Sequence, residues 1–218
     1  MKTFRYIFGT LLLSIIIVSC SSVKTVGTWK GTEPLNLKEK TVIVFSKTND
    51  NVIRTQFEKD LTNRLQENDI KSIESYTLFP KIDISKKLNK FEKKELVKEF
   101  RNKGIDIVVL TVLKDTQKYT TTTTSGADYS KRTYPMYNDK RYYGGFYSYY
   151  DRGFYQSESL STITYEGKKY ILETVTYDLT KSEEDQLVSV ITTEIDNPKT
   201  LGTISKDFSK RVVKQLAK

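Results

Sequence analysis

The sequence predicts an α/β domain in the order β-α-β-α-β, a tyrosine-rich insertion, then β-β-α, with three helices and a mixed sheet of about five strands. Two nearly continuous apolar runs, at 41–46 and 105–113, are typical of buried strands. Segments between and after them repeat apolar residues at helical spacing. Strands that alternate with helices call for a partly parallel sheet with right-handed crossovers.

The first helix is expected to follow the strand at 41–46, with Asn49 or Asp50 as its cap. Its spacing predicts a buried stripe and a set of cations on other faces: Val52 or Ile53, Phe57, Leu61 and Leu65 inside, and Arg54, Lys59 and Arg64 outside. Residues 70–76 alternate like a second strand. A second helix is predicted over 91–103, with Phe91, Leu96 and Phe100 on one side and Gly104 after its end.

The second half of the domain follows a different pattern. The run 105–113 is the most hydrophobic strand of the chain, and 169–179 with 187–195 reads as an antiparallel hairpin. Pro198 lies near the start of a last helix. The apolar stripe of that helix consists of Leu201, Ile204, Phe208, Val212 and Leu216.

Cys20, the only cysteine, closes a short apolar segment at the beginning of the chain. A basic start, an uncharged stretch over 7–18 and a small residue before the cysteine are typical of a secretory signal peptide, whereas a spanning helix needs about 20 apolar residues. The residues IVSC resemble the lipobox of bacterial lipoproteins. That resemblance implies cleavage before Cys20 and acylation of its thiol and amine with fatty acids such as palmitate.

An ordinary signal peptide with an incidental cysteine, or an uncleaved anchor, are the alternatives for this segment. In lipoproteins of diderm bacteria an aspartate after the cysteine favours the inner membrane. Because Ser21 stands there and no acidic cluster follows, the resemblance implies an outer-membrane, periplasm-facing protein, with the inner membrane or the cell surface as alternatives.

The predicted organisation is therefore a signal peptide (1–19), a lipidated tether (20–39) and a single domain (40–218) whose insertion covers 114–166. Trp29 is expected to dock the tether on the domain, since residues 21–37 show no clear periodicity. Lipidation would make the membrane the first partner, because two or three acyl chains anchor a protein stably where one does not.

Composition excludes several functions. Loss of residues 1–19 removes Lys2 and Arg5 and lowers the formal charge from +9 to +7, yet acidic and basic residues are interspersed. Mild attraction to anionic lipid headgroups or to other acidic envelope polymers is thus a better interpretation than nucleic-acid binding. The chain contains no histidine, which excludes Ser-His-Asp and Cys-His catalysis and the commonest zinc ligand.

The carboxylates also favour structural roles. Asp106 is interpreted as polarity at a strand start, Asp178 as a turn organiser, and 183–185 as a solvated hairpin tip. A glycosidase needs two carboxylates held across a cleft, and nothing in the sequence pairs any two. Phosphate-binding glycine loops and calcium loops are missing as well. We expect no enzyme, no metal site and no cofactor.

A tyrosine-rich segment separates the two halves of the domain. Residues 119–155 hold 10 of the 15 tyrosines, interleaved with glycine, lysine and arginine, and show no apolar periodicity. Four interpretations are open: a solvated loop, a protein-recognition surface, a glycan-binding surface, and a membrane-inserting hairpin. The candidate partner-binding residues are Tyr134, Tyr137, Arg141, Tyr142, Tyr143, Phe146, Tyr147, Tyr149, Tyr150 and Arg152.

The order of these elements resembles a family of small bacterial envelope lipoproteins of uncharacterised function. The resemblance rests on TVIVF, RTQFEKDLTNRL, GIDIVVLTVL, the tyrosine-rich insertion, YILETVTYDLT and LVSVITTEI. More distantly, the topology is similar to the amino-terminal domain of the Tol-system periplasmic protein, to lipoprotein activators of peptidoglycan synthases and to the curli-secretion lipoprotein. It implies a lipid-anchored adaptor or scaffold that binds an envelope protein or itself, with a peptidoglycan- or other glycan-binding module as the alternative.

Overall fold

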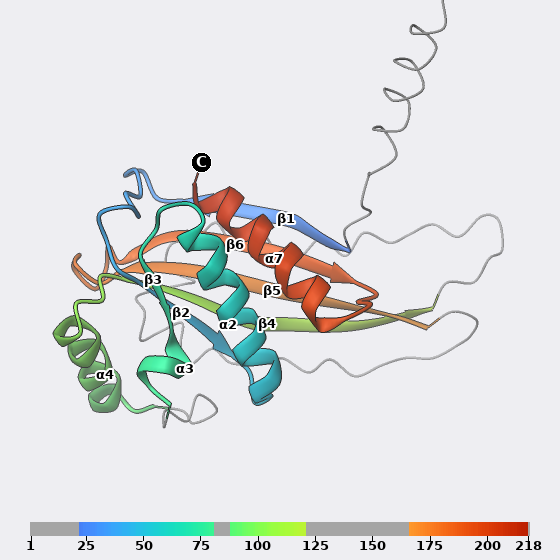
Figure 1. The fold of residues 1–218 in the computed structure, drawn as a ribbon, viewed down its shortest axis with the longest axis horizontal. Coiled ribbons are helices and arrows are strands. Elements are labelled where there is room, and N and C mark those ends of the chain that lie inside the picture. The colour runs from blue at the N-terminus through green and yellow to red at the C-terminus, as the bar shows by residue number, and fades with distance from the viewer. Residues whose placement is uncertain (1–21, 81–87, 121–165, 218) are drawn as a thin grey trace, which may run out of the picture.

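The computed structural model describes residues 22–80, 88–120 and 166–217 (Figure 1). These residues form one sheet of six strands, in the order β1-β6-β5-β4-β2-β3. The strands are β1 (Val23–Lys30), β2 (Val42–Lys47), β3 (Ser72–Glu74), β4 (Ile107–Thr120), β5 (Glu166–Asp178) and β6 (Leu187–Asp196). The helices are α2 (Asn51–Gln66), α3 (Ser75–Leu78), α4 (Lys90–Asn102) and α7 (Leu201–Leu216).

The predicted α/β class is confirmed. β2 pairs in parallel with both β3 and β4, as the alternating first half requires. β5 pairs antiparallel with β4 and β6, so 169–179 and 187–195 do form a hairpin. The sheet is mixed because only the strands joined by helices can return in the same direction.

Two apolar cores lie on the two faces of the sheet. In β2, Val42 and Val44 belong to the core beneath α2 and α7, while Ile43 and Phe45 belong to the core beneath α4. This alternation follows from the two-residue period of a strand. Figure 1 shows α2 and α7 side by side across one face of the sheet.

The extra strand lies where the sequence indicated an irregular tether. Residues 23–30 form β1, which pairs antiparallel with β6. Its side chains alternate strictly between less and more exposed positions, although its register with β6 shifts at a bulge between Thr25 and Gly27. The less exposed positions hold Val23, Thr25, Gly27 and Trp29, and Val26 is 44% exposed, so the apolar residues do not follow the two-residue period that marks a strand in a sequence. Trp29 is partly buried and packs against the core on the α4 side, as expected.

The helices differ from the expectation in three respects. The segment 70–76 contains only the short strand β3, and a fourth helix, α3, begins at Ser75. Phe91, predicted to be buried, is 72% exposed, while Leu96 and Phe100 are buried. Arg54, predicted to face solvent, is only 5% exposed, because it pairs with a buried carboxylate described below.

The cap of α2 is Asp50, whose carboxylate accepts hydrogen bonds from the backbone N–H groups of Val52 and Ile53. Phe57, Leu61 and the rest of the predicted α2 stripe are buried, except for the first turn, where Val52 is 70% exposed. Among the described residues no helix is both long enough and apolar enough to cross a bilayer.

Candidate functional site

The β4–β5 ladder extends beyond the rest of the sheet and forms an arm. β2 leaves β4 after the pair Lys47↔Val112, and β6 leaves β5 after the pair Asp196↔Lys169. The β4–β5 pairing nevertheless continues to Thr120↔Glu166. We define the arm as 113–120 with 166–171. β4 therefore runs about 25 Å past the end of β2, but β6 flanks β5 as far as Lys169, so only 118–120 and 166–168 form a two-stranded tip, about 10 Å long.

A bulge lies at the base of the arm, just after β4 passes the end of β2. The β4–β5 register shifts between Leu113 and Asp115, so Lys114 is the additional residue. A bulge bends a strand and increases its twist, which changes the direction of the strand beyond it. Lys114 forms an ion pair of 3.4 Å with the buried Glu173 of β5, and this contact fixes the bulge to the sheet.

The tip of the arm is held by Tyr119. Its ring lies over Gly167, the residue opposite it in β5, where an added Cβ would be 2.2 Å from the Tyr119 Cζ. The Tyr119 hydroxyl donates a 2.6 Å hydrogen bond to Asp196 at the end of β6. Glycine at 167 therefore has a steric reason, and the arm is tied to the third strand of the sheet.

A mostly apolar cavity of about 360 Å³ lies beside the base of the arm, where α2 and α7 both begin. We call it the helix-start pocket. It is lined by residues from the ends of β2 and β6, from the arm and from both helices: Ser46, Lys47, Thr48, Ile53, Phe57, Thr111, Leu113, Tyr170, Leu172, Ile195, Pro198, Lys199, Thr200, Leu201 and Ile204. Its walls suit an apolar ligand, with lysine and hydroxyl groups available for a polar end.

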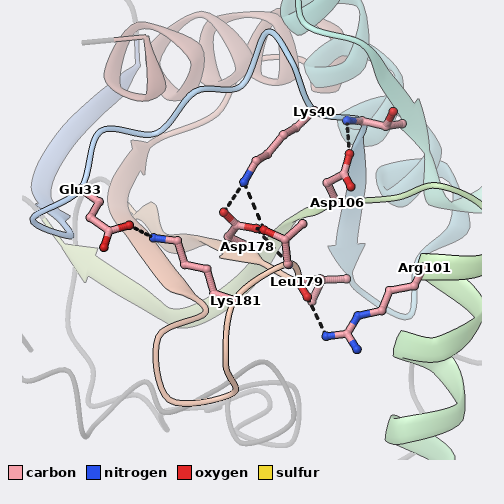
Figure 2. Close-up of polar contacts among 9 residues, drawn as sticks. Glu33, Lys40, Arg101, Asp106, Asp178, Leu179 and Lys181 are labelled. Carbon is pink, nitrogen blue, oxygen red and sulfur yellow. Dashed lines mark hydrogen bonds and ion pairs between the residues drawn. The ribbon is translucent and has the colours of Figure 1, made fainter.

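Asp106 and Asp178, two of the carboxylates weighed in the sequence, lie at the opposite end of the sheet, where both have structural partners (Figure 2). Lys40 donates to the buried Asp178 carboxylate and, at 3.3 Å, to Thr180. Thr180 donates to the same carboxylate through its N–H at 3.0 Å and its hydroxyl at 2.6 Å. Asp106 accepts a 2.9 Å hydrogen bond from the N–H of Thr41. The Lys40 bonds join the chain before β2 to the β5–β6 turn, and the Thr41 bond joins it to the start of β4.

Burial alone would raise the pKa of Asp178, but the hydrogen bonds from Lys40 and Thr180 outweigh it and hold that pKa below its ordinary value. Asp178 is thus an ionised turn organiser, in the role that the sequence suggested. A cavity of about 260 Å³ nearby is lined by Asp106 but not by Asp178. The two carboxylates do not face each other across a cleft, as a glycosidase pair must.

A second buried carboxylate escaped the sequence analysis. Glu58 of α2 is fully buried and accepts from Arg54 Nε at 3.1 Å, from the Ser46 N–H at 2.9 Å and from the Ser75 hydroxyl at 2.8 Å. The Tyr76 N–H donates at 3.1 Å, and Arg54 Nη2 also donates to Ser75 at 2.8 Å. This cluster joins α2, β2 and α3. The four-residue spacing of Arg54 and Glu58 was the one sequence signal for it.

Burial raises the pKa of Glu58 above its ordinary value, although the hydrogen bonds from Ser46 and Ser75 and the charge of Arg54 oppose this. A serine beside a carboxylate can suggest a nucleophile and base. However, the side chains of Ser75 and Glu58 are both fully buried, and neither lines the helix-start pocket. The cluster is a structural connection between elements.

Across residues 22–80, 88–120 and 166–217, no group of three or more Cys, Asp or Glu side chains could hold a metal ion. Cys20 and all ten candidate partner-binding residues of the tyrosine-rich segment lie outside the described residues. The structure places only the residues that flank 121–165, Thr120 and Glu166, which pair at the arm tip.

No protein-family model matches the sequence. No curated protein matches it significantly. Among solved structures, a PelC dodecamer from Paraburkholderia phytofirmans is 9% identical, with 89% of this chain and 96% of that chain covered and a TM-score of 0.46. A variant PelC dodecamer from the same organism is 10% identical, with 89% and 97% covered and a TM-score of 0.43. A likeness at these TM-scores indicates nothing about the function of this chain.

Proposed function

We propose that this chain is a lipid-anchored envelope lipoprotein without enzymatic activity, which presents its Tyr/Arg-rich segment to a protein partner as an adaptor or scaffold. One observation carries the proposal. The β4–β5 arm holds Thr120 and Glu166 opposite each other at its tip, so the chain leaves the sheet before 121 and returns to it after 165 at the same place. The arm is braced by the Tyr119–Asp196 hydrogen bond and fixed to the sheet at its bulge.

The composition of the loop supports recognition of a protein. Tyrosine and arginine provide large contact areas at a low cost in side-chain entropy and are enriched at energetically important interface positions. The two-stranded tip carries the chain about 10 Å beyond β6, at the end of the domain where Ser22 leads into β1, so a partner would meet the segment near the anchor and away from the two cores. The lipobox-like sequence before Cys20 supports the anchored state.

A loop-exchange experiment tests the presentation of a partner-binding segment. Because Thr120 and Glu166 are a cross-strand pair, a two-residue Asn-Gly turn can replace 121–165 and close the arm as a hairpin. The unmodified chain and this variant are used to capture partners from solubilised envelopes, with equal thermal stability as the requirement for comparison. We expect the variant to lose a specific partner.

A matched control keeps the length of the loop and changes only its recognition chemistry. In it, the candidate tyrosines, from Tyr134 to Tyr150, are replaced by serine. Loss of the same partner with this control assigns binding to the rings. An unchanged set of captured proteins with both variants contradicts the adaptor function. If the domain co-sediments with purified peptidoglycan and both variants abolish this, the result favours the glycan alternative.

Lipidation is tested separately. We expect cells supplied with an alkyne-tagged palmitate to label the unmodified chain and not the Cys20→Ser variant. Incorporation that persists without Cys20 would contradict the proposed anchor.

A further inference from the structure

The helix-start pocket lies at the end of the domain at which the chain enters from Cys20. The Asp196 N–H donates a 2.9 Å hydrogen bond to the Ser22 carbonyl, and Val23 pairs with Ile195, which lines the pocket. Figure 1 shows that β1 begins at the same end of the molecule as α7. Pocket and chain entry are therefore adjacent.

The chain between Cys20 and β1 is very short. Only Ser21 and Ser22 separate Cys20 from Val23, and three residue steps span at most about 11 Å. The polar layer on each side of a bilayer is about 5–8 Å thick, as the total thickness less the hydrocarbon core implies. An acylated Cys20 would thus hold the pocket end of the domain against the lipid headgroups.

The pocket has the chemistry of an acyl-chain site. Phe57, Leu172 and Ile204 contribute walls from α2, the sheet and α7, and Ile53 at the rim is 38% exposed. Val52, beside that rim, is 70% exposed. Exposed apolar side chains around an apolar cavity are expected where a protein meets a membrane or another apolar partner.

The distribution of charge selects an anionic lipid surface. Lys24 is exposed beside Val23 and Lys199 is exposed where it lines the pocket, whereas Lys47, which also lines the pocket, is only 6% exposed and is not counted. The nearby Asp50 carboxylate is turned toward the first N–H groups of α2. Each lysine close to an anionic membrane contributes about 1 kcal/mol of attraction. The exposed acidic residues 183–185 are in the β5–β6 turn, at the other end of β5 from the arm.

We propose that the α2 and α7 side of the domain around the helix-start pocket faces the membrane, with the arm tip, which lies at the same end, beside the lipid surface, and that the pocket seats an acyl chain of an anionic phospholipid of that membrane. This inference rests on the proposed lipid anchor. In this arrangement the anchor holds the protein at the membrane, and the lipid contact at the pocket fixes the orientation of the domain.

Depth-dependent quenching in vesicles tests the orientation. Cys20 is the only native cysteine, so acylation leaves an introduced cysteine as the single site for a fluorescent label. Gly202→Cys in the first turn of α7 places the label beside the pocket, where an added Cβ meets no atom within 4 Å. Glu184→Cys in the exposed β5–β6 turn is the matched control. The full chain is reconstituted into phosphatidylethanolamine–phosphatidylglycerol vesicles containing a spin-labelled phospholipid.

We expect quenching at position 202 to be at least twofold stronger than at position 184. Equal quenching in a chain that floats with the vesicles overturns the orientation and leaves the anchor intact. A chain that does not float, and whose Cys20 takes up the label, overturns both proposals. These two results distinguish a failure of the inference from a failure of the proposed function.

Occupation of the pocket has its own measurement. The vesicles then carry phosphatidylglycerol with a photoactivatable group near the end of one acyl chain, and the crosslinked peptides are identified by mass spectrometry. We expect crosslinks to residues 53–57 of α2 and 198–204 around the start of α7. Crosslinks confined to other segments, or a complex between two copies of the chain without lipid, overturn the assignment of the pocket to an acyl chain.

Discussion

Replacement of Arg54 by methionine should destabilise the domain strongly, because it removes the counter-charge from a fully buried carboxylate. Arg54 is 5% exposed and its Nε lies 3.1 Å from Glu58, which is fully buried. Breaking a buried pair on one side costs about 3–5 kcal/mol. Since Glu58 retains donors from Ser46, Ser75 and Tyr76, we expect a loss near the lower limit, about 3 kcal/mol at pH 8.

The pH dependence follows from the raised pKa of Glu58. The folded protein binds this proton more tightly than the unfolded chain does, so the contribution of Glu58 to stability is complete below the ordinary pKa of 4.5 and is lost as the pH rises through the folded value. Without Arg54 the folded pKa rises further. The cost of Arg54→Met should therefore be smallest near pH 4 and should increase toward pH 8.

Urea denaturation of the mature chain carrying Cys20→Ser, followed by circular dichroism at both pH values, measures these free energies. The matched control is Arg64→Met on the same helix. Arg64 pairs with Glu67 at 2.7 Å, but the two side chains are 40% and 60% exposed, so its loss should cost less than about 1 kcal/mol. Equal costs for the two arginines, or a cost of Arg54→Met that does not change with pH, would show that Arg54 does not stabilise the domain as the counter-charge of Glu58.

Three further substitutions test the arm, the far end of the sheet and the core. Gly167→Ala should lower stability by about 1–3 kcal/mol through its clash with Tyr119, and adding Tyr119→Ala should restore most of the loss in the same thermal melts; no recovery would argue against that contact. Lys40→Met should cost about 2–4 kcal/mol at neutral pH. The folded pKa of Asp178 is lowered, so the stability that this carboxylate contributes is present above its ordinary pKa of 3.8 and is lost as the pH falls through the folded value. The cost of Lys40→Met should therefore shrink in acid denaturation curves. Phe57→Ala should cost about 3–5 kcal/mol in urea, since its ring is 6% exposed in the core between α2 and α7; a cost below 1.5 kcal/mol would mean that this core refills.

The strongest periodic patterns predicted their elements correctly. The apolar run at 105–113 includes the buried part of β4, and the stripe from Leu201 to Leu216 is the buried side of α7. Such patterns succeed because the apolar face of an element must be buried whichever neighbour covers it. The pattern did not reveal β1, because Val23 is the one fully buried apolar residue of this edge strand and Val26 is 44% exposed.

Arg54 shows a different limit of prediction from sequence, since its burial depends on contacts between distant segments. Its charge correctly indicates that it needs a polar environment, but a partner or the solvent can provide that environment. Only the approach of β2 and α3 brings Ser46, Ser75 and the Tyr76 N–H around Glu58, residues that are 12 to 18 positions away in the chain. Arg54 is buried because that set of donors and acceptors is complete.

Local order and spacing along the chain were enough to predict the α/β class and the parallel and antiparallel halves of the sheet, and they are the basis on which we expect acylation of Cys20. Only the folded domain shows how far β4 and β5 continue together, that Thr120 and Glu166 pair at the arm tip, and that the helix-start pocket adjoins the chain entry at Val23. These depend on strand register and on contacts between distant segments, which the packing of the whole sheet fixes and which no local pattern specifies.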